Sequence, residues 1–143
     1  MFVKPFIVCY NYNITKTIMY QVKRQWTNAK KQIVNGFRYD SGFEATYGLY
    51  LEGELKAGKI ERFERQINIP LIVNGYKVCD YRIDFIVYHK DGITEYVEVK
   101  GYQTDVWKLK WKLFESLYTD KPDVKLTIIQ QGKYKPPKLR KIQ

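Results

Sequence analysis

One stretch of the chain, Tyr81–Lys100, limits the possible folds more than any other. Apolar and polar residues alternate along it, which is typical of β-strands with one buried face. The pair Asp91-Gly92 divides it and favours a two-residue turn with positive φ. The sequence therefore predicts a β-hairpin over this stretch.

Three charged residues of this hairpin fall close together. Side chains along a strand repeat with period two, so Glu98 and Lys100 project from one face of the second strand, and Asp84 lies in the first. Such groups are costly to desolvate unless they are paired, hydrated or bound to a metal. A cross-strand salt bridge is the simpler interpretation of this set, and a metal site is the functional one.

One helix is predicted before the hairpin and one after it. The first has Ser41 as its N-cap and Gly58 as its stop, and the second runs from Thr104 to about Thr119. Apolar residues recur at helical spacing in both. In the first they are Phe43, Tyr47, Tyr50, Leu51 and Leu55, and in the second Val106, Leu109, Leu113, Phe114 and Leu117.

Further strands are predicted at Ile60–Val73, which the turn Asn74-Gly75 joins to the hairpin, and at Val124–Ile129. A strand that follows a crossover helix pairs parallel to the strand before it. The expected order is one helix, three antiparallel strands, a second helix and a strand. This is an α/β fold with a mixed sheet flanked by helices.

The net positive charge of the chain lies at its two ends. Residues 1–39 carry seven Lys and Arg and residues 131–143 carry five, and neither segment has an acidic residue. We interpret 1–36 as a basic, aromatic arm for dimerisation or DNA contact, 37–130 as the core and 131–143 as a basic tail. A polyanionic partner, nucleic acid before anionic membrane, is the natural interpretation, and basic tails that only aid solubility are the alternative.

These residues resemble the PD-(D/E)XK nuclease superfamily, whose site is an Asp late in the second strand, Glu-x-Lys in the third and often a Glu on the first helix. Asp84, Glu98-Val99-Lys100 and Glu44 match that pattern. The segments Phe37-Arg38-Tyr39-Asp40-Ser41, Glu64-Arg65-Gln66 and Val97-Glu98-Val99-Lys100-Gly101, with Thr104, are similar to small phage-encoded endonucleases related to Holliday-junction resolvases. The resemblance covers about residues 31–120 and implies a restriction-endonuclease-like core. Ile83 stands where the superfamily's name has Pro.

The resemblance implies metal-dependent hydrolysis of DNA phosphodiesters. Asp84, Glu98 and the Val99 carbonyl would bind Mg²⁺, for which Mn²⁺ would substitute, and Glu44 would be a further ligand or would position a water molecule. Lys100 would position the attacking water and stabilise charge on the phosphate. The motif Ser41-x-x-Glu44 is also a capping box, and this purely structural role for Glu44 stays open.

Other residues are weaker candidates. Gln66 would support the site from the strand before the hairpin or point outward. Trp107 and Trp111 are expected in the core or an interface, with stacking on DNA bases as the alternative. The expected DNA contacts are basic residues of the second helix and the tail: Lys108, Lys110, Lys112, Lys133, Lys135, Lys138, Arg140 and Lys141.

The expected function is a metal-dependent DNA endonuclease on branched DNA, acting as a homodimer because a two-fold dimer supplies two sites to a symmetric junction. The alternatives are a nicking, repair or packaging endonuclease on other DNA, and a non-catalytic DNA-binding protein on a nuclease-like fold. No apolar run is long enough to span a membrane. Two isolated cysteines, Cys9 and Cys79, fit a cytoplasmic protein, in the host cell if phage-encoded.

Overall fold

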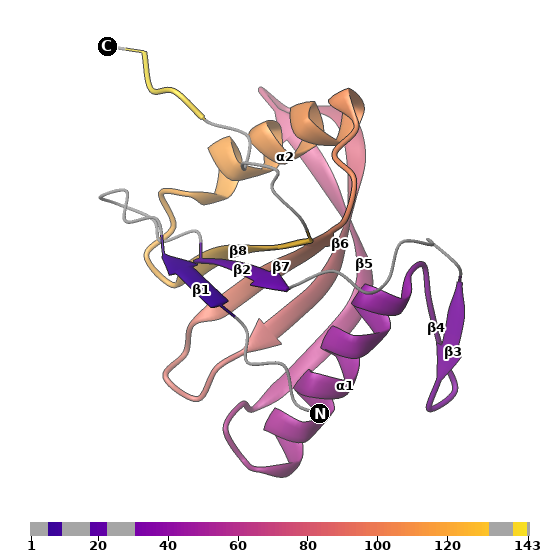
Figure 1. The fold of residues 1–143 in the computed structure, drawn as a ribbon. Coiled ribbons are helices and arrows are strands. Elements are labelled where there is room, and N and C mark those ends of the chain that lie inside the picture. Colours follow the sequence, from indigo (N-terminus) through magenta and orange to yellow (C-terminus); the bar gives the residue numbers. More distant parts are fainter. Residues whose placement is uncertain (1–5, 10–17, 23–30, 132–138, 143) are drawn as a thin grey trace.

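The computed structural model describes residues 6–9, 18–22, 31–131 and 139–142 (Figure 1). Its centre is a six-stranded sheet in the order β1-β2-β8-β7-β6-β5. The strands are β1 (Phe6–Cys9), β2 (Ile18–Val22), β5 (Arg62–Val73), β6 (Tyr76–Tyr88), β7 (Thr94–Lys100) and β8 (Val124–Gln131). A separate two-stranded sheet is formed by β3 (Gln32–Val34) and β4 (Phe37–Tyr39).

Pairing directions in the large sheet agree with the sequence. β5, β6 and β7 pair antiparallel, and β8 returns parallel to β7 after a crossover helix. The predicted mixed α/β fold is therefore confirmed. Within the segment interpreted as an arm, β2 pairs parallel with β8 and β1 pairs antiparallel with β2, so both belong to the same sheet.

The two helices begin where their caps predict. α1 (Gly42–Lys56) has Ser41 as its N-cap, and Gly58 follows its end with a φ of +70°. α2 (Asp105–Tyr118) has Thr104 as its N-cap. Among the described residues, no helix is long and apolar enough to cross a membrane.

Each helix covers its own part of the core. Under α1, Phe43 and Leu51 join Phe85, Val87 and Val97 from the sheet. Under α2, two tryptophans and Phe114 pack on residues from the other half of the sheet, among them Leu71, Ile83, Leu126 and Ile128. Figure 1 shows the two helices beside different parts of the long β5–β6 hairpin.

The predicted apolar stripe of α2 is wrong in part. Val106 and Leu109 are 66% and 71% exposed, and the buried face is formed by Trp107, Trp111 and Phe114. These three bulky aromatics fill more of the space over the sheet than the aliphatic residues one position away would. In α1, similarly, Tyr50 and Leu55 are exposed although Phe43 and Leu51 are buried.

The turn at Asp91-Gly92 is longer than predicted. β6 ends at Tyr88 and β7 begins at Thr94, and His89 N–H donates to the Ile93 carbonyl. Three residues remain between that pair, and of these Gly92 has a φ of +87°. Loops of this length are built on a turn followed by one left-handed residue, so the glycine is needed but a two-residue turn is not. The predicted turn Asn74-Gly75 does have positive φ at both positions, and so does the turn Asn35-Gly36 between β3 and β4.

A break in the β5–β6 hairpin positions the site. Gln66 has a φ of +51°, and neither it nor Asp84 opposite takes part in the regular strand pairing. Across this point the odd-numbered residues change sides: Ile83 packs with the α2 cluster and Phe85 with the α1 cluster. Because of this distortion, one hairpin contributes apolar residues to the core under each helix. Asp84 lies at the point where the buried side of the strand changes.

Candidate active site

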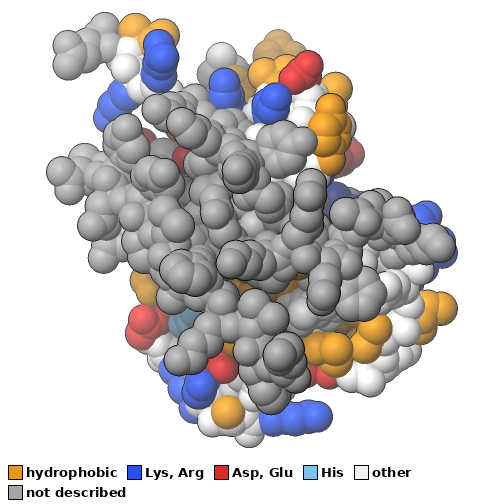
Figure 2. All heavy atoms as spheres, viewed as in Figure 1, with side chains coloured by type: hydrophobic (Ala, Val, Ile, Leu, Met, Phe, Trp, Pro, Cys, Tyr) orange, Lys and Arg blue, Asp and Glu red, His pale blue; other side chains and the backbone are white. Residues whose placement is uncertain are grey.

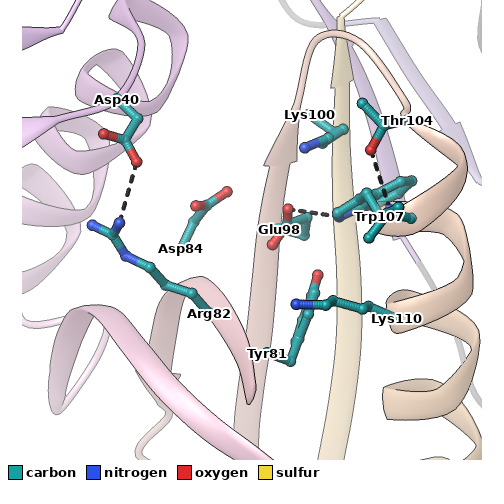
Figure 3. A pocket seen from close by; sticks show the side chains of 10 residues that line it. Asp40, Tyr81, Arg82, Asp84, Glu98, Lys100, Thr104, Trp107 and Lys110 are labelled. Atoms are coloured by element: carbon teal, nitrogen blue, oxygen red, sulfur yellow. Dashed lines mark hydrogen bonds and ion pairs between the residues drawn. The ribbon is translucent and has the colours of Figure 1, made fainter. Parts of the chain in front are cut away.

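A pocket of about 300 Å³ opens where β6, β7 and the first turns of α2 meet (Figure 3). Asp84 from β6 and Glu98 from β7 line it, and Lys100 lies two residues beyond Glu98. The three predicted charged residues of the hairpin thus share one pocket. Its other lining residues are Asp40, Tyr81, Arg82, Thr104, Val106, Trp107 and Lys110.

Asp84 is held by the backbone of the neighbouring strand. Regular pairing of β6 with β7 ends at Phe85 and Val97, and beyond it the Val99 N–H donates to Asp84 Oδ2 at 2.8 Å. Burial raises the pKa of the Asp84 carboxyl well above its ordinary value, and the nearby charges of Glu98 and Glu44 raise it further. The Asp84 carboxylate thus accepts from the Val99 N–H in place of a backbone carbonyl of β6.

Glu98 is buried with one oxygen bound and one unbound. The Trp107 Nε1–H donates to its Oε1 at 2.8 Å. Its buried Oε2 has no hydrogen bond of regular geometry from a described residue, although the buried Tyr81 hydroxyl, which also lacks one, lies close enough to lower the pKa of Glu98. Burial raises the pKa of Glu98 to about 7, against the lowering effect of the Lys100 ammonium. Asp84 and Glu98 are therefore adjacent carboxyl groups that both have raised pKa values. Their ionised forms are electrostatically unfavourable together in the absence of a cation.

Glu44 lies beside this pair but does not line the pocket. Its N–H donates to Ser41 Oγ at 3.1 Å, which is one half of a capping box. The carboxylate accepts from the Asp40 N–H at 3.1 Å, where a regular capping box would use the Ser41 N–H. Its other oxygen accepts from Gln66 Nε2 at 3.0 Å. Burial is the largest cause of the raised pKa of Glu44.

Gln66 links the helix to the pocket wall. Besides its bond to Glu44, its Oε1 accepts from Arg82 Nη2, and Arg82 Nη1 lies 3.5 Å from Asp40 Oδ2. Gln66 therefore points inward, as one of its two predicted orientations requires. Figure 3 shows Arg82 and Asp40 facing each other at the edge of the pocket opposite α2.

Sequence reasoning missed three of the residues that line or shape the pocket. Arg82 carried a usable signal, because it lies two residues before Asp84 on the same strand. Asp40 lies within the segment that carries the resemblance to nucleases. Trp107 was expected in the core and is buried, but its hydrogen bond to Glu98 depends on how α2 packs.

The donor set suits a hard divalent cation. All the acidic groups offer oxygen, which Mg²⁺ prefers, and Glu98 Oε2 is a buried acceptor without a hydrogen bond of regular geometry from the described residues. No group of three or more His, Cys, Asp and Glu side chains lies close enough to hold a metal within the described part of the chain. A cation here would therefore rest on Asp84 and Glu98, with backbone oxygen and water completing its coordination.

The predicted DNA contacts fall into three groups. On α2, Lys108 pairs with Asp105 at 3.2 Å, Lys112 is exposed, and Lys110 lines the pocket and donates to the Asp80 carbonyl at 3.0 Å. Arg140 and Lys141 are exposed, whereas Lys133, Lys135 and Lys138 lie outside the described residues. Figure 2 shows one face of the molecule, much of which consists of residues not described. The described Lys and Arg side chains lie around its margin.

A family model described as "Protein of unknown function (DUF1064)" matches residues 24–136. The matched segment includes every residue of the pocket and the whole of both helices. A search of curated proteins finds no match to the chain.

Proposed function

The chain belongs to the DUF1064 family, and we propose that it is a Mg²⁺-dependent DNA endonuclease with a core of the PD-(D/E)XK type. One observation carries the proposal: the half-buried Asp84 and the buried Glu98 share a pocket that also contains Lys100. Burial raises the pKa of both carboxyl groups, and such clusters of perturbed groups in a cleft are typical of catalytic sites.

Asp84 and Glu98 would hold the metal ion, with the Val99 carbonyl as a further oxygen ligand. When bound, Mg²⁺ supplies a Lewis acid that makes a water nucleophilic and stabilises the leaving oxygen of the phosphodiester. Mn²⁺ has similar ligand preferences and would substitute. The Val99 N–H contributes by holding Asp84 in place.

Lys100 would act on the substrate. Its side chain is half-buried at the end of β7, on the same face as Glu98. There its ammonium would orient the attacking water and stabilise the negative charge that develops on the phosphate. Glu44, fixed by Gln66 and by the Asp40 N–H, would add negative charge behind the pair and strengthen its preference for a cation.

The proposed substrate is DNA, because the basic residues are concentrated at the two ends of the chain and the chemistry of the pocket suits a phosphodiester. Branched DNA is the form that the sequence resemblance favours, and a homodimer would supply the two sites that a four-way junction requires. A cytoplasmic protein would meet such DNA directly.

The test is nicking of supercoiled plasmid by the wild type and by Asp84→Asn, with Asp91→Asn as a matched control on the same hairpin. Asp91 is exposed in the turn, where its Oδ1 accepts from the Ile93 N–H, a bond that Asn can also make. We expect nicking in Mg²⁺ by the wild type and Asp91→Asn, and none in EDTA or by Asp84→Asn. Wild-type nicking by Asp84→Asn would overturn the proposal.

The DNA structure is tested by cleavage of a four-way junction against linear duplex of the same sequence. Faster cleavage of the junction supports a resolvase-like enzyme, and equal rates indicate an endonuclease with another task. DNA binding without cleavage in any divalent metal would leave only a binding protein on a nuclease-like fold.

A further inference from the structure

Trp107 contacts both charged groups of β7 that the proposed chemistry uses. Its indole N–H donates to Glu98 Oε1 at 2.8 Å, and Lys100 Nζ lies 5.1 Å from the centroid of its ring. At that distance a lysine ammonium is attracted to the face of an indole. The side chain is 7% exposed, so both contacts lie in a largely desolvated environment, where they are stronger than in water.

The position of this indole is fixed by the start of α2. The Trp107 N–H donates to Thr104 Oγ1 at 3.2 Å, and its ring stacks on that of Trp111 with centroids 6.1 Å apart. The loop before the helix is held by two buried glutamines: Gln103 donates to Gln130 at 2.7 Å, and Gln130 donates to the Gly101 carbonyl at 3.1 Å. These contacts therefore fix the indole, so that it can hold Glu98 in one position.

The hydrogen bond from Trp107 makes the two Glu98 oxygens unequal. Oε1 accepts from a neutral donor, and Oε2 is left buried without a hydrogen bond of regular geometry from the described residues. A neutral donor orients the carboxylate without supplying the positive charge that a cation would bring. In metal sites generally, mutation of a group that holds a ligand in this way lowers metal affinity by about 10- to 100-fold.

We propose that Trp107 is a positioning residue for metal binding, which fixes Glu98 with one oxygen open to a divalent cation and holds Lys100 beside it. The inference rests on the proposed function. Trp107 touches neither the metal nor the DNA in this account, and it acts through Glu98 and Lys100.

Trp111 provides a matched control one helical turn away. It is 1% exposed, and its ring packs against Tyr81 and Phe114 in the core. Trp107→Phe and Trp111→Phe make the same chemical change on the same face of α2. Only the first removes the N–H from Glu98, and both keep an aromatic ring.

The experiment is calorimetric titration of wild type, Trp107→Phe and Trp111→Phe with Mn²⁺, without DNA. We expect Trp107→Phe to bind Mn²⁺ about 10- to 100-fold more weakly than wild type, and Trp111→Phe to bind within about 3-fold of it. Thermal melting checks that both variants are folded. Equal Mn²⁺ affinities for the two variants would overturn the inference.

A double-mutant cycle shows whether Trp107 acts through Glu98. In a Glu98→Gln background, Trp107→Phe should weaken Mn²⁺ binding by less than about 3-fold, since the group it positions is already lost. A full 10-fold further loss in that background would mean that the indole acts in another way and would contradict the proposal.

A second measurement applies if Trp107→Phe does not fold. In a Trp26→Phe/Trp111→Phe protein, Trp107 is the one remaining indole, and Mn²⁺ binding should change its fluorescence because its N–H is bonded to a ligand. Calorimetric binding of Mn²⁺ without a change in fluorescence would overturn the inference alone. Absence of Mn²⁺ binding by the wild type would overturn the proposed function as well.

Discussion

At the scale of single residues, burial and charge conflict most strongly at Glu98. Burial raises the pKa of its carboxyl to about 7 from an ordinary 4.5. Between those values the metal-free folded chain binds more protons at this group than the unfolded chain does. Its contribution to the free energy of unfolding therefore falls as the pH rises through this window, and the full cost is present above pH 7.

Glu98→Gln should for this reason stabilise the metal-free protein at pH 8. The shift corresponds to a gain on the order of 3 kcal/mol, which should vanish below pH 4.5. Urea denaturation in EDTA at pH 8 and pH 4.5 measures it. Mg²⁺ should then stabilise the wild type more than the variant, which keeps only Asp84 of the two carboxylates.

The matched control is Glu95→Gln on the same strand. Glu95 is also buried, but it is paired with Lys125 at 3.0 Å and His89 at 2.6 Å, and Thr127 donates to it. Removing its charge breaks these pairs, so this variant should be less stable than wild type at pH 8. A Glu98→Gln protein that is also destabilised at pH 8 without metal would contradict the account of Glu98.

At the scale of elements, α1 has two internal glycines with opposite surroundings. A Cβ at Gly48 would lie 2.8 Å from the Tyr39 Cζ, and Tyr39 is 1% exposed and accepts a hydrogen bond from Arg65. A Cβ at Gly53 would meet nothing within 4 Å. Of these two glycines, only Gly48 is therefore in close packing with a neighbouring side chain.

Replacing each glycine with alanine should give opposite results. Gly53→Ala should stabilise the protein by about 0.5–1 kcal/mol, because alanine is the better helix former. Gly48→Ala should destabilise it by about 1–3 kcal/mol, since the added methyl overpacks the core. Chemical denaturation of the two variants measures both, and a stabilised Gly48→Ala protein would mean that Tyr39 can move aside.

The elements that the sequence predicted correctly are those with local signals. The caps at Ser41 and Thr104 and the turn Asn74-Gly75 depend on a few adjacent residues, so their positions could be predicted without knowledge of the fold. The buried face of α2 could not, because apolar residues occur on two of its faces and packing chooses between them. The left-handed backbone of Gln66 was equally unpredictable, since it is maintained by contacts with Glu44 and Arg82, which are distant in sequence.

The same distinction applies to the site. The alternation along the hairpin was enough to place Asp84 on the strand next to Glu98 and Lys100, but the break at Gln66 and Asp84 that positions the site was not predicted. The indole that holds Glu98 and the Arg82–Gln66–Glu44 chain were missed because they join elements that only tertiary packing brings together.

At the scale of the whole molecule, basic charge at the ends predicts how DNA binding depends on salt. Residues 133–143 hold five Lys and Arg. If each neutralises one phosphate, deleting this segment should reduce the slope of log affinity against log salt by about 4.5, at about 0.9 per contact. Affinity should fall alike for all DNA sequences.

Fluorescence anisotropy with Asp84→Asn protein, over a range of NaCl concentrations, gives this slope without cleavage. A variant of full length with the five basic residues of the segment changed to Gln separates charge from chain length and should match the deletion. An unchanged slope in both proteins would mean that the tail does not contact DNA.

The central claim is that the pocket between β6, β7 and α2 is a metal centre. It is tested most directly by anomalous X-ray diffraction from crystals of the protein soaked in Mn²⁺. The account predicts an anomalous peak between the carboxylates of Asp84 and Glu98 that is lost in Asp84→Asn crystals. Mn²⁺ bound elsewhere, with this pocket empty at a concentration that supports DNA cleavage, would contradict it.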